Sequence, residues 1–258
     1  MSKKLPAIFV GHGSPMNIVY TNAFTRDLEA LGRTLPVPDA IAVVSAHWLT
    51  RGTWVTASAT PEQIYDFYGF PPDLYRFRYP SPGSPDAAEL IKNTPSGTII
   101  STDPSRGIDH AAWTILKYIF PEASIPVLEI SIDIAREAKH HYTLGQSIAA
   151  LREKNILVIG SGNLIHNLGE IDFDSDAKPF GWAEEFDLIL RDNLISRNDG
   201  ALINYTSLGK NSRRAIPFPD HYYPMLYILG MTGQDEQIRF FHDSIQNGSV
   251  AMRSFITG

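Results

Sequence analysis

Short apolar runs alternate along the chain with longer segments in which apolar residues recur every three or four positions. Short apolar runs rich in β-branched residues are typical of parallel strands buried on both faces. The predicted strands occupy 7–10, 41–45, 126–131 and 156–159. The predicted helices occupy 22–31, 108–120, 135–152 and 181–196. This alternation predicts an α/β fold with a central, mostly parallel mixed sheet and helices on both faces.

Weaker patterns supply the remaining predicted elements. The turn Arg51-Gly52 leads into a candidate hairpin partner of the preceding strand. Thr21 is the expected N-cap of the first helix, and Asp109 is the expected N-cap of the helix over 108–120. The other predictions are strands over 53–57 and 98–101, a helix over 85–93, and helical segments around 224–229 and 234–241.

A long stretch with little regular pattern interrupts these elements between residues 61 and 85. It is rich in proline, tyrosine and phenylalanine. Loops of this length in compact domains are often functional lids. An aromatic-anchored loop that simply packs on the body of the protein explains the same composition. Both interpretations stay open at the level of sequence.

The composition limits the classes of protein to which the chain can belong. A length of 258 residues suits one α/β domain, so we expect a single domain over residues 1–258. The net charge of −6 argues against a nucleic-acid partner, which requires clustered lysine and arginine. No apolar run approaches the roughly 20 residues of a membrane helix, and residues 1–6 lack a secretory apolar region. We therefore expect a cytoplasmic protein with no membrane partner.

Histidines stand where predicted strands end. His12 and His47 each follow an apolar strand, and His166 comes a few residues after Gly160-Ser161-Gly162, which we interpret as a turn. The carboxyl ends of parallel strands share one edge of an open α/β sheet, where ligands bind. The chain has no cysteine, so any metal must be bound by His, Asp or Glu. We therefore expect the active site at the carboxyl edge of the strands.

The other five histidines are less distinctive. His221 lies in a proline-stiffened approach to an apolar helix, where a capping or surface role is also plausible. His110 stands in the first turn of its helix, where the helix dipole disfavours protonation, and either a hydrogen-bonding or a packing role fits. The remaining three lie among polar helix residues and are assigned to solvated faces: His140, His141 and His242.

Two familiar motifs are incomplete. The glycines at 160 and 162 suggest a dinucleotide-binding turn, but Ile165 occupies the place of the third glycine of that fingerprint. Gly11-His12-Gly13-Ser14-Pro15 does not match the serine-hydrolase pattern Gly-x-Ser-x-Gly. The sequence therefore supports neither a dinucleotide-binding protein nor a serine hydrolase.

Five blocks in sequence order carry a resemblance to a known family. The blocks are Gly11-His12-Gly13-Ser14-Pro15, Ser45-Ala46-His47-Trp48, Gly107-Ile108-Asp109-His110-Ala111-Ala112-Trp113, the Gly160-to-Leu168 segment with His166, and Asp220-His221-Tyr222-Tyr223-Pro224. Together they resemble the class III extradiol ring-cleavage dioxygenases of the LigB-like superfamily, most closely the DOPA extradiol type. The resemblance extends over nearly the whole chain.

The resemblance implies roles for five histidines. His12, His47 and His221 correspond to the metal ligands. His166 corresponds to the acid/base histidine, which is close enough to count as a fourth ligand without substrate. His110 corresponds to a second active-site histidine that hydrogen-bonds substrate or oxygen. The implied metal is mononuclear non-haem Fe(II). Zn(II) is an alternative, because related facial triads place Glu where this chain has His221 and imidazole-rich sites also suit zinc.

The implied activity is insertion of O₂ into a DOPA-like catechol next to its hydroxyls, giving a muconic semialdehyde. Two alternatives stay open: a zinc-dependent hydrolase that uses the same histidines, and a non-enzymatic binding protein of the same superfamily. The aromatic-rich loop is a candidate cover for the ring, and Arg213 or Arg214 a candidate partner for a substrate carboxylate. The sequence carries no signal for the identity of the catechol or for the oligomeric state.

Overall fold

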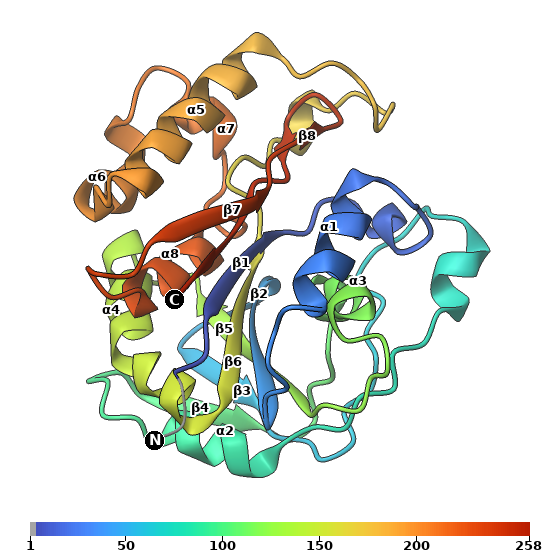
Figure 1. Ribbon diagram of the computed structural model, residues 1–258, viewed down its shortest axis with the longest axis vertical. Coiled ribbons are helices and arrows are strands. Elements are labelled where there is room, and N and C mark those ends of the chain that lie inside the picture. The colour runs from blue at the N-terminus through green and yellow to red at the C-terminus, as the bar shows by residue number, and fades with distance from the viewer. Residues whose placement is uncertain (1–3) are drawn as a thin grey trace.

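An eight-stranded mixed sheet runs through the middle of the molecule (Figure 1), in a computed structural model that describes residues 4–258. The strand order is β4-β3-β5-β2-β6-β1-β10-β7. The strands are β1 (Ala7–Gly11), β2 (Ala40–Thr50), β3 (Thr53–Thr56), β4 (Ile100–Asp103), β5 (Val127–Asp133), β6 (Ile156–Gly162), β7 (Ile238–His242) and β10 (Ser254–Thr257). A separate two-stranded ribbon pairs β8 (Ile245–Gln246) with β9 (Val250–Ala251).

The four central strands β5, β2, β6 and β1 are parallel neighbours. On one side, β3 pairs antiparallel with β5, and on the other β10 pairs antiparallel with β1. The edge strand β7 pairs antiparallel with β10 and therefore runs parallel to the centre. The predicted α/β fold with a mostly parallel mixed sheet is therefore confirmed. The carboxyl ends of the parallel strands converge on one edge, as the sequence predicts.

Helices cover both faces of the sheet. On one face α1 (Ala23–Gly32) and α3 (His110–Ile119) pack together, and on the other α4 (Ala138–Ile148) packs against α8 (Tyr223–Met231) (Figure 1). Side chains that alternate along β1 divide accordingly, with Ile8 in one core cluster and Phe9 in the other. The remaining helices are α2 (Pro85–Lys92), α5 (Gly181–Ile195), α6 (Asp199–Ile203) and α7 (Ser212–Ala215). Alternating burial on two faces explains why the central strands are continuously apolar.

Several predicted boundaries are wrong. The strand predicted over 53–57 does not pair with β2 as a hairpin but lies between β4 and β5. The N-cap of α1 is Asn22 rather than Thr21, since the Asn22 side chain accepts a hydrogen bond from the Thr25 amide. Asp109 does cap α3, accepting from the Ala111 amide. The helix predicted over 135–152 is shorter and continues as a 3₁₀ helix over Ala149–Lys154.

The segment predicted as helical around 234–241 is a turn followed by strand β7, which begins at Ile238. In β7, Ile238 and Phe240 pack on one core cluster and Phe241 packs on the other, which is the period of two of a strand. The assignment of three histidines to solvated faces is wrong for two of them. His141 and His242 are buried, whereas His140 is half-buried.

The irregular stretch over 61–85 contains one 3₁₀ turn (Pro72–Arg76) and ends at the first residue of α2. It folds against α3, where the Trp113 indole donates a hydrogen bond to the Ile64 carbonyl. The predicted lack of a secretory signal depends partly on residues 1–3, which lie outside the described residues. Within residues 4–258, none of the helices has the length and apolarity needed to cross a membrane.

Candidate metal centre

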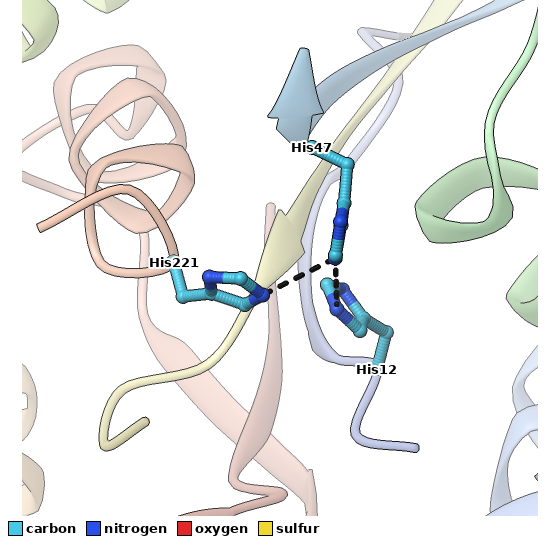
Figure 2. Close-up of side chains that lie close together, drawn as sticks. All are labelled: His12, His47 and His221. Carbon is cyan, nitrogen blue, oxygen red and sulfur yellow. Dashed lines mark hydrogen bonds between the residues drawn. The ribbon is translucent and has the colours of Figure 1, made fainter. Parts of the chain in front are cut away.

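Three histidines from distant parts of the chain point toward a common centre (Figure 2). His12 follows β1 directly, His47 lies in β2 where the register with β5 shifts, and His221 precedes α8. The Nε2 atom of His47 lies 3.3 Å from Nε2 of His12 and 3.2 Å from Nε2 of His221. One ligand atom from each residue lies within 4.8 Å of the other two. The carboxyl edge of the sheet thus brings three imidazole nitrogens together.

The end of β6 holds two of these histidines in place. The His12 amide donates to the Gly162 carbonyl at 3.0 Å, and the Asn163 amide donates to the His221 carbonyl at 2.9 Å. A Cβ atom on Gly162 would lie 2.1 Å from the His221 carbonyl oxygen, so only glycine permits this approach. The segment 160–162 is therefore part of a strand rather than the predicted turn, and its glycine admits the chain that carries His221.

Hydrogen-bond partners fix the orientation of the His12 ring. Its Nδ1 lies 3.0 Å from Ser161 Oγ, whose own hydroxyl proton goes to the Ala111 carbonyl at 2.6 Å. Ser161 can therefore only accept from His12, which places the imidazole proton on Nδ1 and leaves a lone pair on Nε2. Such outer partners are typical of metal-binding histidines.

A carboxylate lies beside Nδ1 of each of the other two rings. Nδ1 of His47 lies 3.2 Å from Asp66 Oδ2, and Nδ1 of His221 lies 3.3 Å from Asp220 Oδ2 without a hydrogen bond. The Nε2 atoms of the three rings face one another across the centre. Lone pairs at such separations repel, and a cation placed between them removes the repulsion. The donor set therefore fits a metal that accepts imidazole nitrogen.

Burial keeps two of the rings neutral. It lowers the pKa of His12 and of His221 well below the ordinary value, and the neighbouring imidazoles lower both further. Burial is the largest influence on His47 and opposes its protonation, but the hydrogen bond to Asp66 and the charges of Asp66, Asp109 and Asp220 together raise the pKa of that ring. Neutral imidazole is the form that binds metal.

His110 and His166 flank the three-histidine group on different sides. Nδ1 of His110 lies 2.9 Å from Asp66 Oδ1, and its ring centroid lies 4.1 Å from that of His47. The His166 ring stacks on His221 with centroids 3.6 Å apart and planes 12° apart. Burial lowers the pKa of His110, and lowers that of His166 to about 4. All five histidines singled out from the sequence are therefore brought together.

A buried polar network supports this cluster from behind. Asp109 accepts hydrogen bonds from Ser45 Oγ at 2.8 Å and from Arg106 at 2.9 Å. Ser45 Oγ in turn accepts from the His47 amide at 3.1 Å, and the Asp109 amide donates to Glu129 at 2.7 Å. Burial and the nearby Asp109 raise the pKa of Glu129 well above its ordinary value. The network joins the backbones beside His47 and His110.

The histidines form the base of a cavity of about 730 Å³. Aromatic and aliphatic side chains supply much of its wall, from the segments 15–20, 66–70, 168–175 and 246–250. The aromatic stretch over 61–85 thus contributes Phe67, Tyr68 and Phe70 to the wall. Neither Arg213 nor Arg214, the candidate carboxylate partners, lines the cavity.

Sequence reasoning missed Asp66, the carboxylate that faces both His47 and His110. It lies in the irregular stretch, where no periodic pattern marks it. The available signal was chemical: a metal-binding histidine needs an acceptor for its second nitrogen. Gly11 and Gly13 serve the path of the chain around His12. A Cβ on Gly11 would meet the Met252 backbone at 2.8 Å, and Gly13 has a φ of 61°.

The fold and the site together define an α/β protein with a histidine cluster that fits a metal ion at the carboxyl edge of its sheet. Residues 7–252 match the family described as the catalytic LigB subunit of aromatic ring-opening dioxygenase, and the chain belongs to this family.

Relatives of the chain cover it almost completely. The 4,5-DOPA dioxygenase extradiol of Escherichia coli (strain K12) is 41% identical over 261 residues, which cover 100% of this chain and 96% of that protein. The protein of the same name from Beta vulgaris is 34% identical over 253 residues, or 96% of this chain and 94% of its own length. A crystal structure of an uncharacterized Escherichia coli K12 protein superposes with a TM-score of 0.87 at 38% identity, covering 98% of this chain and 100% of that one.

Proposed function

We propose that this protein is an extradiol ring-cleaving dioxygenase, a metal-dependent oxidoreductase that inserts O₂ into a catechol to give a muconic semialdehyde. The observation that carries the proposal is the convergence of three imidazole nitrogens at the base of a cavity of about 730 Å³, which is large enough to hold a catechol. Membership of a family described by aromatic ring opening, and relatives named 4,5-DOPA dioxygenase extradiol, support it. The zinc-hydrolase and binding-protein alternatives are not favoured. DOPA is the first substrate to test.

His12, His47 and His221 would hold the metal, for which Fe(II) is the proposed identity and Zn(II) the alternative. Three protein ligands leave coordination positions open. When bound, Fe(II) supplies the electron exchange that allows triplet dioxygen to react with a catecholate. In the absence of substrate, His166 would be a further ligand; its donor atom lies within 4.8 Å of those of His221 and Asp220.

His166 acts as the acid/base residue in this proposal. Burial lowers its pKa to about 4, so the ring is neutral at pH 7 and able to accept a proton from a catechol hydroxyl. Stacking on His221 orients the ring at the cavity wall. The His166 ring then returns this proton to the substrate later in the reaction.

His110 hydrogen-bonds the substrate or dioxygen. Its position at the first turn of α3 and its contact with Asp66 fix the ring beside His47. A preorganised polar group in a buried site stabilises developing charge more effectively than a mobile one. The apolar wall excludes water around the reacting ring.

Anaerobic loading with Fe(II), followed by addition of oxygen and a set of catechols that includes DOPA, tests the proposal. We expect oxygen uptake in step with formation of a yellow ring-cleaved product. A matched Zn(II)-loaded sample should be inactive under the same conditions. If no catechol yields product with Fe(II), or if an ester is hydrolysed without oxygen by the Zn(II) form, the proposed function is wrong.

A further inference from the structure

The ribbon formed by β8 and β9 supplies part of the cavity wall in register with His166. Gln246 pairs with Val250 across the ribbon, and Val250 pairs in turn with His166 in an isolated antiparallel bridge. Residues directly opposite each other in antiparallel pairs point their side chains to the same face. All three of these residues line the cavity. His166, Val250 and Gln246 therefore form a row across the cavity wall.

The length of this row matches a catechol with a short substituent. Neighbouring strands lie about 4.8 Å apart, so the backbone of Gln246 stands about 10 Å from that of His166. A catechol whose hydroxyl meets the His166 ring extends its own ring over Val250, which is buried and apolar. A short substituent at ring carbon 4 then reaches the side chain of Gln246.

A chain of hydrogen bonds fixes the orientation of the Gln246 amide. Asn22 Oδ1 accepts from the Thr25 amide at 3.0 Å, and Asn22 Nδ2 donates to Asn17 Oδ1 at 3.1 Å. Asn17 is buried, and its Nδ2 donates to the His12 carbonyl and to Gln246 Oε1, both at 3.3 Å. Gln246 Nε2 donates back to Asn17 Oδ1 at 3.4 Å. Asn17 therefore holds the Gln246 amide in one orientation beside the cavity.

The Gln246 amide keeps hydrogen-bonding capacity for a ligand. A glutamine amide has two N–H donors and two acceptor lone pairs, and Asn17 occupies one of each. One N–H of Gln246 therefore remains for a carboxylate oxygen, and one lone pair remains for a donor. Among the described residues that line the cavity, none is a lysine or an arginine, so an anionic group must be bound by uncharged donors. Gln246 is half-buried, so a carboxylate bound there keeps part of its hydration.

We propose that Gln246 recognises the polar end of a short substituent at ring carbon 4 of the catechol, with Nε2 donating to a carboxylate there. Val250 contacts the ring, and Asn17 is a positioning residue that acts through Gln246. This inference rests on the proposed dioxygenase function and names a residue that determines the substrate specificity of the same site.

A matched pair of substrates isolates this hydrogen bond. 3-(3,4-Dihydroxyphenyl)propionate ends in a carboxylate, and 4-(3-methylbutyl)catechol replaces the carboxylate with an isopropyl group of nearly the same shape. In the Fe(II)-loaded Gln246→Leu protein, we expect the ratio of kcat/KM for the acid to that for the alkyl catechol to fall at least about tenfold. Leucine keeps the volume of the side chain and loses the donor, so the change should lie mainly in KM.

A second variant and a control make the comparison specific. In Gln246→Glu a carboxylate faces that of the acid, so the same ratio should fall further than in Gln246→Leu. The control Gln146→Leu makes the leucine change at an exposed glutamine of α4 that does not line the cavity, and it should keep the ratio of the unsubstituted protein. A ratio that is unchanged in either Gln246 variant, or that falls equally in the control, would overturn the inference.

Binding to the Zn(II)-loaded protein separates this inference from the proposed function. Calorimetric titration with the acid measures its Kd without turnover, and we expect this Kd to rise about tenfold in Gln246→Leu. If the Kd rises but the Fe(II)-loaded protein cleaves no catechol, the dioxygenase proposal is wrong and the binding role of Gln246 is supported. If the alkyl catechol is cleaved but the Kd of the acid is the same in Gln246→Leu, the inference alone is wrong.

Discussion

Buried polar groups at the two ends of the parallel strands differ in whether the protein itself supplies their hydrogen-bond partners. At the amino end, the fully buried Arg152 donates to the Leu5 carbonyl at 2.7 Å, to the Met231 carbonyl at 2.9 Å and to both Glu236 oxygens at 2.8 Å. At the carboxyl end, the Nε2 atoms of the histidines face one another. The Arg152 network is complete within the protein, whereas the histidine cluster needs a bound ligand.

This difference separates a structural network from a binding site. A buried charge that is fully hydrogen-bonded joins elements, as Arg152 joins the approach to β1, the end of α8 and the Glu236 turn. A cluster of buried acceptors without donors is unfavourable by itself and is relieved by a ligand. Substitutions at the two ends should therefore affect different properties.

Loss of one ligand nitrogen should have the largest effect. In His12→Ala we expect metal binding to be abolished and activity to fall to background, while the fold stays largely intact, because the site contributes repulsion rather than packing. Metal content by mass spectrometry and circular dichroism measure the two properties. The control His140→Ala removes a half-buried histidine from α4 and should bind metal normally. Full metal occupancy in His12→Ala would overturn the assignment of this ligand.

Removal of the proposed acid/base group should lower turnover and retain the metal. In His166→Gln we expect kcat to fall by about 10²–10⁴-fold, the usual contribution of general acid/base catalysis. Metal content should stay near that of the unsubstituted protein, since three other histidines remain. Steady-state kinetics beside metal analysis test this prediction. Retention of full kcat would exclude His166 from proton transfer.

Disruption of the amino-end network should lower stability without affecting the metal. In Glu236→Gln the buried Arg152 loses its charged partner, and we expect a loss of about 3–5 kcal/mol in the free energy of unfolding. Urea denaturation measures this loss. The matched control Glu89→Gln breaks an exposed pair with Lys92 and should cost less than about 1 kcal/mol. A comparable fall in metal affinity in Glu236→Gln would contradict the separation of the two ends.

The same pair predicts a pH dependence of stability. Burial alone would raise the pKa of Glu236, but hydrogen bonds from Arg152 and the Gly233 amide lower it to about 2, from an ordinary value of 4.5. The folded protein therefore releases this proton more readily than the unfolded chain. The stabilisation is fully present above pH 4.5 and is lost as the pH falls toward 2. The Glu236→Gln variant should lack this contribution to acid denaturation.

The smallest effect is expected for Asp66, which lies beside the proposed ligands but is not one of them. In Asp66→Asn the carboxylate that faces His47 and His110 becomes neutral, and we expect the metal Kd to rise by about 10–100-fold. Metal titration in competition with a chelator measures this change. Asp73→Asn, an exposed aspartate of the same irregular stretch, is the matched control. An unchanged Kd in Asp66→Asn would show that Asp66 does not tune the ligands.

Local sequence patterns were sufficient to predict those elements that are determined by their own residues. The apolar runs of β1 and β6 and the spacing of α5 were recognisable in sequence, and so was Asp109 as a cap. The histidine cluster followed from strand ends and from resemblance. Features that depend on a distant partner were not recognisable. The strand character of residues 160–162 depends on pairing with β1 and β2, and the burial of His141 depends on stacking with Tyr223 at 4.2 Å.

The hydrogen bonds from His12 to Gly162 and from Asn163 to His221 have a consequence for how the protein acquires its metal during synthesis. The first ligand leaves the ribosome early, but the strand that positions it and the last ligand are made much later. A nascent chain that ends before residue 221 therefore cannot present the three nitrogens together. If these histidines bind the metal as proposed, loading therefore requires a chain that extends past residue 221 and has folded around β6.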